Sequence, residues 1–255
     1  MTHIIAIANA KGGVAKTTTT LSLGAMLAEA GQRVLLIDLD PHANLTISLG
    51  MRPPSLERTI ADVLLGAMHL DEVLYSTTQA KLQLIPSNHD LQLAEAHLIV
   101  RENYEMILSE ALKTTAGFDS ILLDCPPTLG TLTHNALAAA DLLIIPTQPE
   151  YFSAHALRDM LNMILTVRAR YNSRLRYRIL LTMLDRRNRI HGDLAGQIRT
   201  AFNQATFSTE IEIDTRLRES PVFGKPINQY APSSRASHQY RELAQELGKT
   251  FHELR

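Results

Sequence analysis

The sequence predicts an α/β protein built on a doubly wound, mostly parallel β-sheet with helices on both faces. Short apolar runs alternate along the chain with longer segments of helical periodicity, which is the pattern of β-α-β units. Most of these runs lack a polar–apolar alternation, as expected for strands covered on both faces. No repeat, low-complexity segment or linker interrupts the chain, so we expect residues 1–255 to form a single domain.

Each element is expected where its own pattern is clearest. Strands are expected in the most continuous apolar runs, at residues 3–8, 33–38, 82–86, 120–124, 142–146 and 177–184. Helices are expected at residues 16–30, 90–100, 104–115, 153–170, 192–203 and 234–254. Gly31 can end the first helix, because a residue without Cβ turns the chain readily. Segments rich in proline and serine, at residues 51–58 and 230–237, are expected to be loops.

Composition excludes several classes of protein. The single cysteine, Cys125, excludes an internal disulfide and any multi-cysteine metal or iron–sulfur site built from one subunit. No apolar run approaches the ~20 residues that a membrane-spanning helix needs. The last expected helix mixes acidic and basic residues around its apolar face, which favours packing on the core over membrane binding. We therefore expect a cytoplasmic protein that does not bind membranes.

A phosphate-binding loop is expected at residues 8–20, which read ANAKGGVAKTTTT. The segment follows the first strand and opens the first helix, where unpaired backbone N–H groups and the helix dipole favour phosphate. Compared with the pattern G-x-x-x-x-G-K-[ST], Ala10 and Ala15 replace both glycines. Gly12 and Gly13 still allow the backbone to approach phosphates closely.

The hydroxyl and amine groups of this loop have separate expected roles. Lys16 is expected to bind the β- and γ-phosphates of a nucleotide, and Thr17 to bind Mg²⁺. Thr18 can hydrogen-bond the α-phosphate. If position 15 requires a positive φ, Ala15 costs about 1 kcal/mol of backbone strain, and its methyl group can shift the nucleotide and slow hydrolysis.

Three aspartates are expected at the same edge of the sheet as this loop. Asp38 and Asp40 end one buried strand and Asp124 ends another, and ligands of open α/β sheets bind beyond the carboxyl ends of the strands. Asp124 is suited to hold Mg²⁺ directly or through water. Asp38 and Asp40 are two residues apart, so they point the same way while the chain stays extended and can share the metal and the attacking water.

The loop resembles a known family. The deviant Walker A motif K-G-G-V-G-K-T-T of the ParA/MinD branch of P-loop ATPases is matched by Lys11, Gly12, Gly13, Val14, Lys16, Thr17 and Thr18. Residues 34–46 resemble the D-x-D-P-Q-x-N segment of the family, and residues 124–141 resemble its Walker B region. Further segments, at residues 145–157, 180–190 and 216–247, resemble Soj-like ParA proteins. The resemblance implies a P-loop NTPase fold with ATP and Mg²⁺ as cofactors.

The resemblance also implies roles for single residues. Lys11 is expected to reach across an ATP-dependent homodimer to the nucleotide of the other subunit, so that Lys11, Lys16 and Asp40 form the catalytic set. Asp40 is expected to position water, with Asp38 nearer the metal. Nucleotide contacts are expected from Lys11, Gly12, Gly13, Val14, Ala15, Lys16, Thr17, Thr18, Met183, Asp214 and Thr215. Mg²⁺ contacts are expected from Thr17, Asp38, Asp40 and Asp124. Around Asp214 the chain reads IDTR where relatives usually have I-P-R-N.

Nonspecific DNA is the expected polyanion partner. Residues 158–189 contain nine arginines and two acidic residues, a net charge of +7 in a chain whose net charge is −1. The family resemblance marks Arg187, Arg189 and Arg218 as candidates for contacts with DNA phosphates. The expected function is chromosome or plasmid segregation on the nucleoid with a ParB-like partner. Two alternatives stay open: an ATP-gated DNA-binding switch with little or no hydrolysis, and a ParA-like positioner of a protein cargo.

Overall fold

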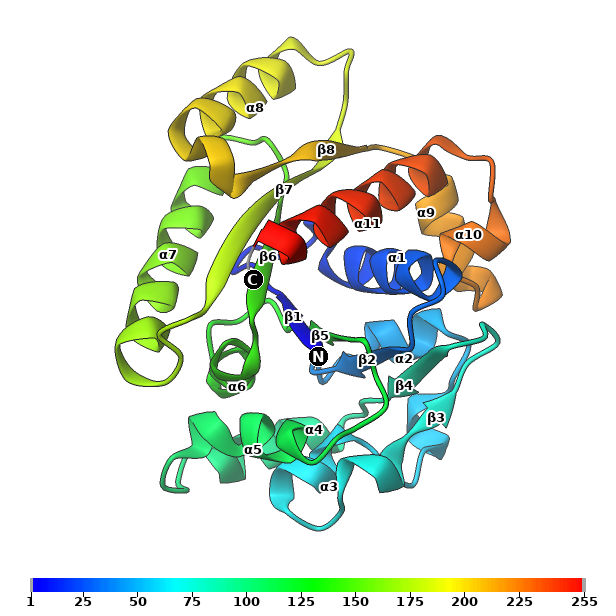
Figure 1. Cartoon of the computed structure of the whole chain (residues 1–255), viewed down its shortest axis with the longest axis vertical. Helices are drawn as coiled ribbons and strands as arrows, with labels where there is room; N and C mark the ends of the chain where they lie inside the picture. The colour runs from blue at the N-terminus through cyan, green and yellow to red at the C-terminus, as the bar shows by residue number, and fades with distance from the viewer. Residues whose placement is uncertain (1, 254–255) are drawn as a thin grey trace.

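Among residues 2–253, which the computed structural model describes, eight strands form one sheet in the order β3-β4-β2-β5-β1-β6-β7-β8 (Figure 1). The strands are β1 (His3–Ile7), β2 (Val34–Asp38), β3 (Tyr75–Ser76), β4 (Leu82–Ile85), β5 (Ser120–Asp124), β6 (Leu142–Thr147), β7 (Arg176–Leu184) and β8 (Thr206–Glu212). β3 pairs antiparallel with β4, and the other pairs are parallel. The predicted fold class is confirmed.

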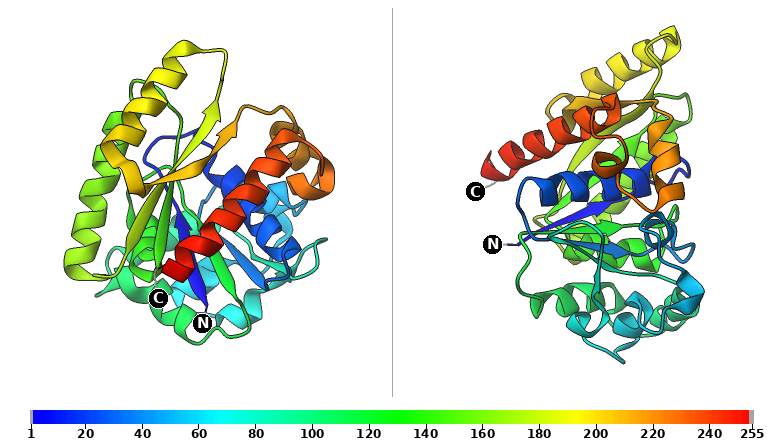
Figure 2. Two further views of the ribbon diagram at one scale, coloured as in Figure 1. Left: turned by 45° about the horizontal axis from the view of Figure 1, so that its top comes forward. Right: turned by 90° about the vertical axis from the view of Figure 1, so that its right-hand side faces the viewer.

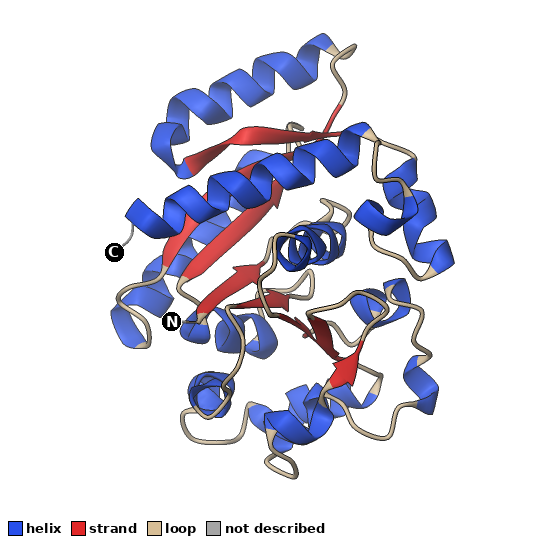
Figure 3. Cartoon of the chain, turned by 45° about the vertical axis from the view of Figure 1, so that its right-hand side comes forward, coloured by secondary structure: helices blue, strands red, loops and turns tan. Residues whose placement is uncertain are grey.

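Helices cover both faces of this sheet, as Figures 2 and 3 show. The helices are α1 (Lys16–Glu29), α2 (Asn44–Ser48), α3 (Ile60–Leu65), α4 (Asp90–Leu98), α5 (Ile107–Lys113), α6 (Thr131–Ala139), α7 (Ser153–Arg170), α8 (Arg189–Phe202), α9 (Arg216–Glu219), α10 (Ile227–Tyr230) and α11 (Arg235–Glu253). One core cluster lies between the sheet and helices α1 and α11. A second cluster lies on the opposite face of the sheet and includes residues of the five helices α3, α4, α5, α6 and α7. Successive strand residues alternate between the two clusters: Leu36 belongs to the first, while Leu35 and Ile37 belong to the second. This double burial explains the continuous apolar runs.

Helix α1 packs unusually close to the sheet, and this positions the loop before it. A Cβ at Gly24 would lie 2.6 Å from a Leu36 methyl group, so only glycine fits there without a shift. On its outer side α1 is covered by α11, whose Tyr240, Leu243 and Leu247 are fully buried or nearly so. The start of α1 is therefore held rigidly at the edge where the parallel strands end.

The structure adds elements that the sequence pattern did not reveal. The six expected strands are present, but β8 follows them as an edge strand whose burial does not alternate cleanly. Its mixed polar composition, TFSTEIE, hides it from a search for apolar runs. Helix α8 begins at Arg189, earlier than expected, because the Asn188 side chain accepts a hydrogen bond from the N–H of Ile190 (3.1 Å) and caps it. Helices α2, α3, α6, α9 and α10 were also not expected; four of them have six residues or fewer, while α6 has nine, with seven of them buried, and lacks a clear polar face.

No helix within residues 2–253 is long and apolar enough to cross a bilayer. The helices pack on the sheet, and the loops after β1, β2, β5 and β8, together with the end of β7, line the candidate site at the carboxyl edge of the strands.

Candidate nucleotide-binding site

The loop between β1 and α1 has the backbone conformation of an anion cradle. Gly13 (φ 73°) and Ala15 (φ 67°, ψ 34°) both adopt the left-handed region, and Ala15 occupies the N-cap of α1 without a side-chain cap. No atom lies within 4 Å of the position that a Cβ would take at Gly12 or Gly13, so the backbone there is open to a ligand. The first turn of α1 contains no acidic residue. The helix N-terminus is therefore free to attract phosphate.

The two lysines of the loop lie in different surroundings. Lys16 is buried, and its Nζ donates to the carbonyl of Lys11 (3.2 Å). Burial lowers the pKa of Lys16, and the charges of Asp124, Cys125 and Asp40 oppose this effect. Lys11 instead forms an ion pair with Glu150 in the loop after β6. Lys16 thus faces its own loop, whereas Lys11 is turned toward the surface.

Asp124 joins β5 to the start of α1. Its Oδ2 accepts from the hydroxyl of Thr17 (2.7 Å) and its Oδ1 from that of Thr20 (3.0 Å). The carboxyl is fully buried, and burial raises the pKa of Asp124 to about 8; the charge of Asp38 adds to the shift, and the two hydroxyl groups oppose it. A cation near Thr17 would favour the ionised carboxylate.

Asp38 and Asp40 point differently, because the chain turns directly after β2. Asp38 is fully buried: Oδ1 accepts from the N–H of Asp40 (3.1 Å), and Oδ2 from the N–H (2.9 Å) and hydroxyl (2.7 Å) of Thr46. Burial raises the pKa of Asp38 to about 6, against the hydrogen bonds from Thr46. Asp40 lines the cavity, whereas Asp38 does not. The two carboxylates thus have different surroundings, and their shared role at a metal stays a prediction.

The donor set fits a magnesium ion that arrives with a nucleotide. Residues 2–253 contain no cluster of three or more histidine, cysteine, aspartate or glutamate side chains placed to hold a metal alone. Mg²⁺ prefers one or two protein oxygens together with phosphate oxygens and water. The linked hydroxyl of Thr17 and carboxyl of Asp124, directly beside the loop, match that preference.

A cavity of about 420 Å³ opens in front of the loop. We call its loop side the phosphate end, formed by Gly12, Gly13, Ala15, Lys16, Thr17 and Thr18. We call its other side the base end, formed by Met183, Ile211, Glu212, Ile213, Asp214, Leu217 and Arg218. Its four apolar side chains suit the faces of a flat ring.

A backbone irregularity helps to shape the base end. Met183 has a φ of 54°, and the pairing of β7 with β8 shifts register between Leu181 and Leu184. Irregularities of this kind re-aim side chains next to ligand sites. The neighbouring hydroxyl of Thr182 donates to the carbonyl of Val14 (3.1 Å), which ties β7 to the phosphate loop.

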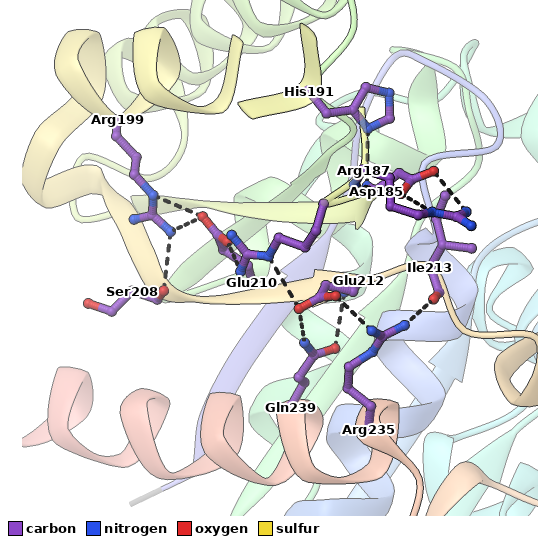
Figure 4. A network of polar contacts seen from close by, with 11 residues as sticks. Asp185, Arg187, His191, Arg199, Ser208, Glu210, Glu212, Ile213, Arg235 and Gln239 are labelled. Carbon is purple, nitrogen blue, oxygen red and sulfur yellow. Dashed lines mark hydrogen bonds and ion pairs between the residues drawn. The ribbon is translucent and has the colours of Figure 1, made fainter. Parts of the chain in front are cut away.

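A polar network holds the wall of the base end in place (Figure 4). Glu212 accepts from Arg235 (2.9 Å), Arg186 (3.3 Å) and Gln239 (3.3 Å), and Arg235 also donates to the carbonyl of Ile213 (2.7 Å). Both carboxylate oxygens of Asp214 are occupied as well, by backbone N–H groups of α9 and α11. Asp214 therefore lines the cavity and also links α9 to α11, and a contact between its carboxylate and a nucleotide base stays a prediction.

Some expected nucleotide contacts lie outside the cavity wall. Lys11, Val14 and Thr215 do not line it. Val14 is buried and meets β7, while Thr215 is the N-cap residue of α9. Conversely, Asn44 and Ser48 on α2 line the cavity and were not named as contacts. Asn44 is the last residue of the segment that resembles D-x-D-P-Q-x-N, so that motif could have indicated it, whereas Ser48 has no such signal.

The three expected DNA contacts are not equivalent. Arg187 forms an ion pair with Asp185 (3.1 Å) and has a side chain that is 90% exposed, and Arg189 begins α8. Arg218 lines the base end of the cavity. The arginine-rich stretch is also divided by β7: Arg176 and Arg178 lie in this strand, four arginines precede it and three follow it.

The doubly wound sheet and the loop, lysine, threonine and aspartate at its carboxyl edge define a P-loop nucleotide-binding protein. Residues 2–177 match the family profile described as an AAA domain. The chain is 40% identical over 249 residues to sporulation initiation inhibitor protein Soj of Bacillus subtilis, with 97% of this chain and 98% of that protein covered. It is 41% identical over 249 residues to chromosome partitioning protein ParA of Myxococcus xanthus, with 97% and 88% covered.

Among solved structures, the chain superposes on cobyrinic acid a,c-diamide synthase from Mycobacterium smegmatis, determined with bound ATP analog and magnesium, with a TM-score of 0.88. The two are 35% identical, and the match covers 100% of this chain and 98% of the other. The chain belongs to the ParA/Soj family of partition ATPases. The family expected from the deviant Walker A motif is confirmed.

Proposed function

We propose that the protein binds ATP with Mg²⁺ in this cavity, forms an ATP-dependent homodimer that binds DNA nonspecifically, and leaves DNA when ATP is hydrolysed. The observation that carries the proposal is the junction of Lys16, Thr17 and Asp124 at the phosphate end. The ATP analog and magnesium in the structure of the Mycobacterium smegmatis relative support this assignment of cofactors.

The residues of the phosphate end divide the work. ATP and Mg²⁺ supply the reactive γ-phosphate and neutralise its charge. Lys16 exchanges the carbonyl of Lys11 for phosphate oxygens, and the backbone N–H groups after Gly12 surround the phosphates. Thr17 would offer its hydroxyl oxygen to Mg²⁺, while the hydroxyl hydrogen stays in the hydrogen bond to Asp124. Asp40 faces the cavity and orients the attacking water.

Dimer formation requires Lys11 to change partner. In one copy of the chain its ammonium group pairs with Glu150, and the two side chains are 27% and 41% exposed. Its backbone stays anchored, because the Lys11 N–H donates to the side chain of Asn9 (2.9 Å). Lys11 can therefore leave Glu150 by a side-chain rotation alone. The phosphates of the ATP bound to a second subunit provide a stronger anionic partner for Lys11 than one carboxylate.

DNA binding and segregation complete the proposal. Arg187 and Arg189 lie after β7 on an exposed turn and helix start, where they can neutralise DNA phosphates without reading bases. The identity with Soj and with ParA of Myxococcus xanthus supports a role in chromosome or plasmid segregation on the nucleoid. A ParB-like partner then stimulates hydrolysis.

One observation favours a second candidate, an ATP-gated DNA switch with little or no hydrolysis. Ala15 occupies a left-handed position where glycine is the low-energy residue, and it lines the cavity. A displaced nucleotide can bind well and react slowly, because reaction depends on alignment more steeply than binding does.

Light scattering of the purified protein with ATP tests the dimer. Lys11→Ala should remain monomeric with ATP at concentrations where the wild type is dimeric. Lys113→Ala, which removes an exposed lysine paired with Glu110 on α5, is the matched control and should dimerise normally. ATP-dependent dimers of Lys11→Ala with the mass and affinity of the wild type would refute the cross-subunit role.

A further inference from the structure

Asp40 is held by the turn that follows β2. Its Oδ1 accepts two hydrogen bonds from one residue, from the backbone N–H of His42 (2.9 Å) and from the ring Nδ1 of His42 (2.8 Å). Since an ionised carboxylate oxygen can only accept, Nδ1 carries the proton in this contact. The His42 side chain is 77% exposed, whereas that of Asp40 is 8% exposed.

The backbone of this turn is fixed independently of the ring. The N–H of Asp40 donates to Asp38 (3.1 Å), its carbonyl accepts from the N–H of Ala43 (2.8 Å), and Ala43 itself adopts a φ of 55°. The main freedom left to Asp40 is rotation of its carboxylate, which is a soft torsion in aspartate. Within residues 2–253 no donor contacts Oδ2, and Asp40 lines the cavity, so Oδ2 remains for water.

We propose that His42 is a positioning residue for hydrolysis: its Nδ1–H fixes Oδ1 of Asp40 so that Oδ2 is aimed at the attacking water. The inference rests on the proposed function, because it needs Asp40 to orient that water. The His42 ring is too exposed to add much to the free energy of unfolding. Its hydrogen bond therefore acts on the orientation of the Asp40 carboxylate. Hydrolysis then depends on His42, while ATP binding at Lys16 and Thr17 does not.

Position 42 distinguishes this chain from the family pattern. The family segment D-x-D-P-Q-x-N has glutamine where this chain has His42. The amide nitrogen of asparagine lies at nearly the same distance from the backbone as Nδ1 of histidine, whereas that of glutamine lies one bond farther. Asparagine is therefore the substitution that preserves the donor to Asp40, and alanine the one that removes it.

Steady-state phosphate release and ATP binding, measured on the full chain, test the proposal. His42→Ala should lower kcat by about tenfold while KM and the Kd for ATP stay within about twofold. His42→Asn should restore most of the rate. His89→Ala, which removes an exposed histidine before α4, is the matched control and should behave as the wild type.

Asp40→Ala separates this inference from the proposed function. It should bind ATP and release almost no phosphate. Normal release by His42→Ala, or a His42→Asn rate as low as that of His42→Ala, would overturn the inference alone. A wild type that binds ATP and releases no phosphate, or an Asp40→Ala variant with the wild-type rate, would overturn the proposed hydrolysis together with this inference.

Discussion

The two ends of the cavity are built in different ways. The phosphate end is almost one continuous segment, residues 12–18, completed by Asp124 from β5. The base end combines β7, β8 and α9 and is held by an ion pair and a hydrogen bond from α11 to Glu212. Local backbone geometry therefore sets phosphate binding, whereas tertiary packing sets base binding. Substitutions that remove a contact should therefore lower ATP affinity more at the phosphate end than at the base end.

Lys16→Ala should have the largest effect, a loss of about 100-fold in ATP affinity, because the buried ammonium group is the charge that faces the phosphates. The fold should tolerate the change, since burial lowers the pKa of Lys16 and the charge is costly without a ligand. Isothermal titration with Mg²⁺ and ATP measures it, with Lys113→Ala as a surface control. Affinity within threefold of the wild type would show that the loop backbone binds phosphate unaided.

Asp124→Asn should change how stability depends on pH. Burial raises the pKa of Asp124 to about 8, while an unfolded aspartate titrates near 4. The folded state thus holds the proton more tightly, and the free energy of unfolding should fall as pH rises from about 4 to about 8. Asp124→Asn should flatten that fall in urea unfolding of the metal-free protein, whereas Asp71→Asn at the surface should not. A slope identical to the wild type would mean that Asp124 stays ionised throughout.

Arg218→Ala should weaken ATP binding about threefold, because Arg218 lines the base end and can stack on a ring. Arg187→Ala should leave ATP binding unchanged, since Arg187 lies outside the cavity and pairs with Asp185. Titration with a fluorescent ATP analogue compares the two. Equal ATP affinity in both variants would mean that Arg218 does not contact the nucleotide.

Ala15→Gly should have the smallest effect on binding and a favourable one on stability, about 0.5–1 kcal/mol, because glycine adopts a φ of 67° without strain. Phosphate release should rise about two- to threefold. Ala30→Gly, at the other end of α1 where φ is −73°, is the matched control and should destabilise the protein. A slower or unchanged rate of phosphate release in Ala15→Gly would show that the backbone strain at Ala15 does not limit ATP hydrolysis.

The phosphate end could be predicted from the sequence because its parts are close along the chain. Lys16, Thr17 and the glycines belong to one strand-to-helix turn, and Asp124 is recognisable as the end of a buried strand. The convergence of strand ends at one edge follows from parallel pairing. The fold class could be predicted for the same reason: strands and helices alternate with periods that are visible locally.

The rest depends on contacts between distant residues or on turns too short to leave a pattern. The pairing of Lys11 with Glu150 and the position of Arg218 at the cavity are set by the packing of loops far apart in the chain. The expectation that Asp38 and Asp40 point the same way assumed an extended chain. The backbone instead bends at Asp40, whose N–H donates to Asp38, and the hydroxyl of Thr46 also donates to the carboxylate of Asp38. Neither the bend nor α2 has a periodic signal.

Retention on DNA in four nucleotide states tests the central claim most directly. Immobilised nonspecific DNA is incubated with the protein and no nucleotide, ADP, ATP or a non-hydrolysable ATP analogue, each with Mg²⁺, at a fixed salt concentration. We predict strong retention with ATP and with the analogue, release with time in ATP alone, and little retention with ADP or without nucleotide. Equal retention in every state would contradict an ATP-gated DNA-binding protein.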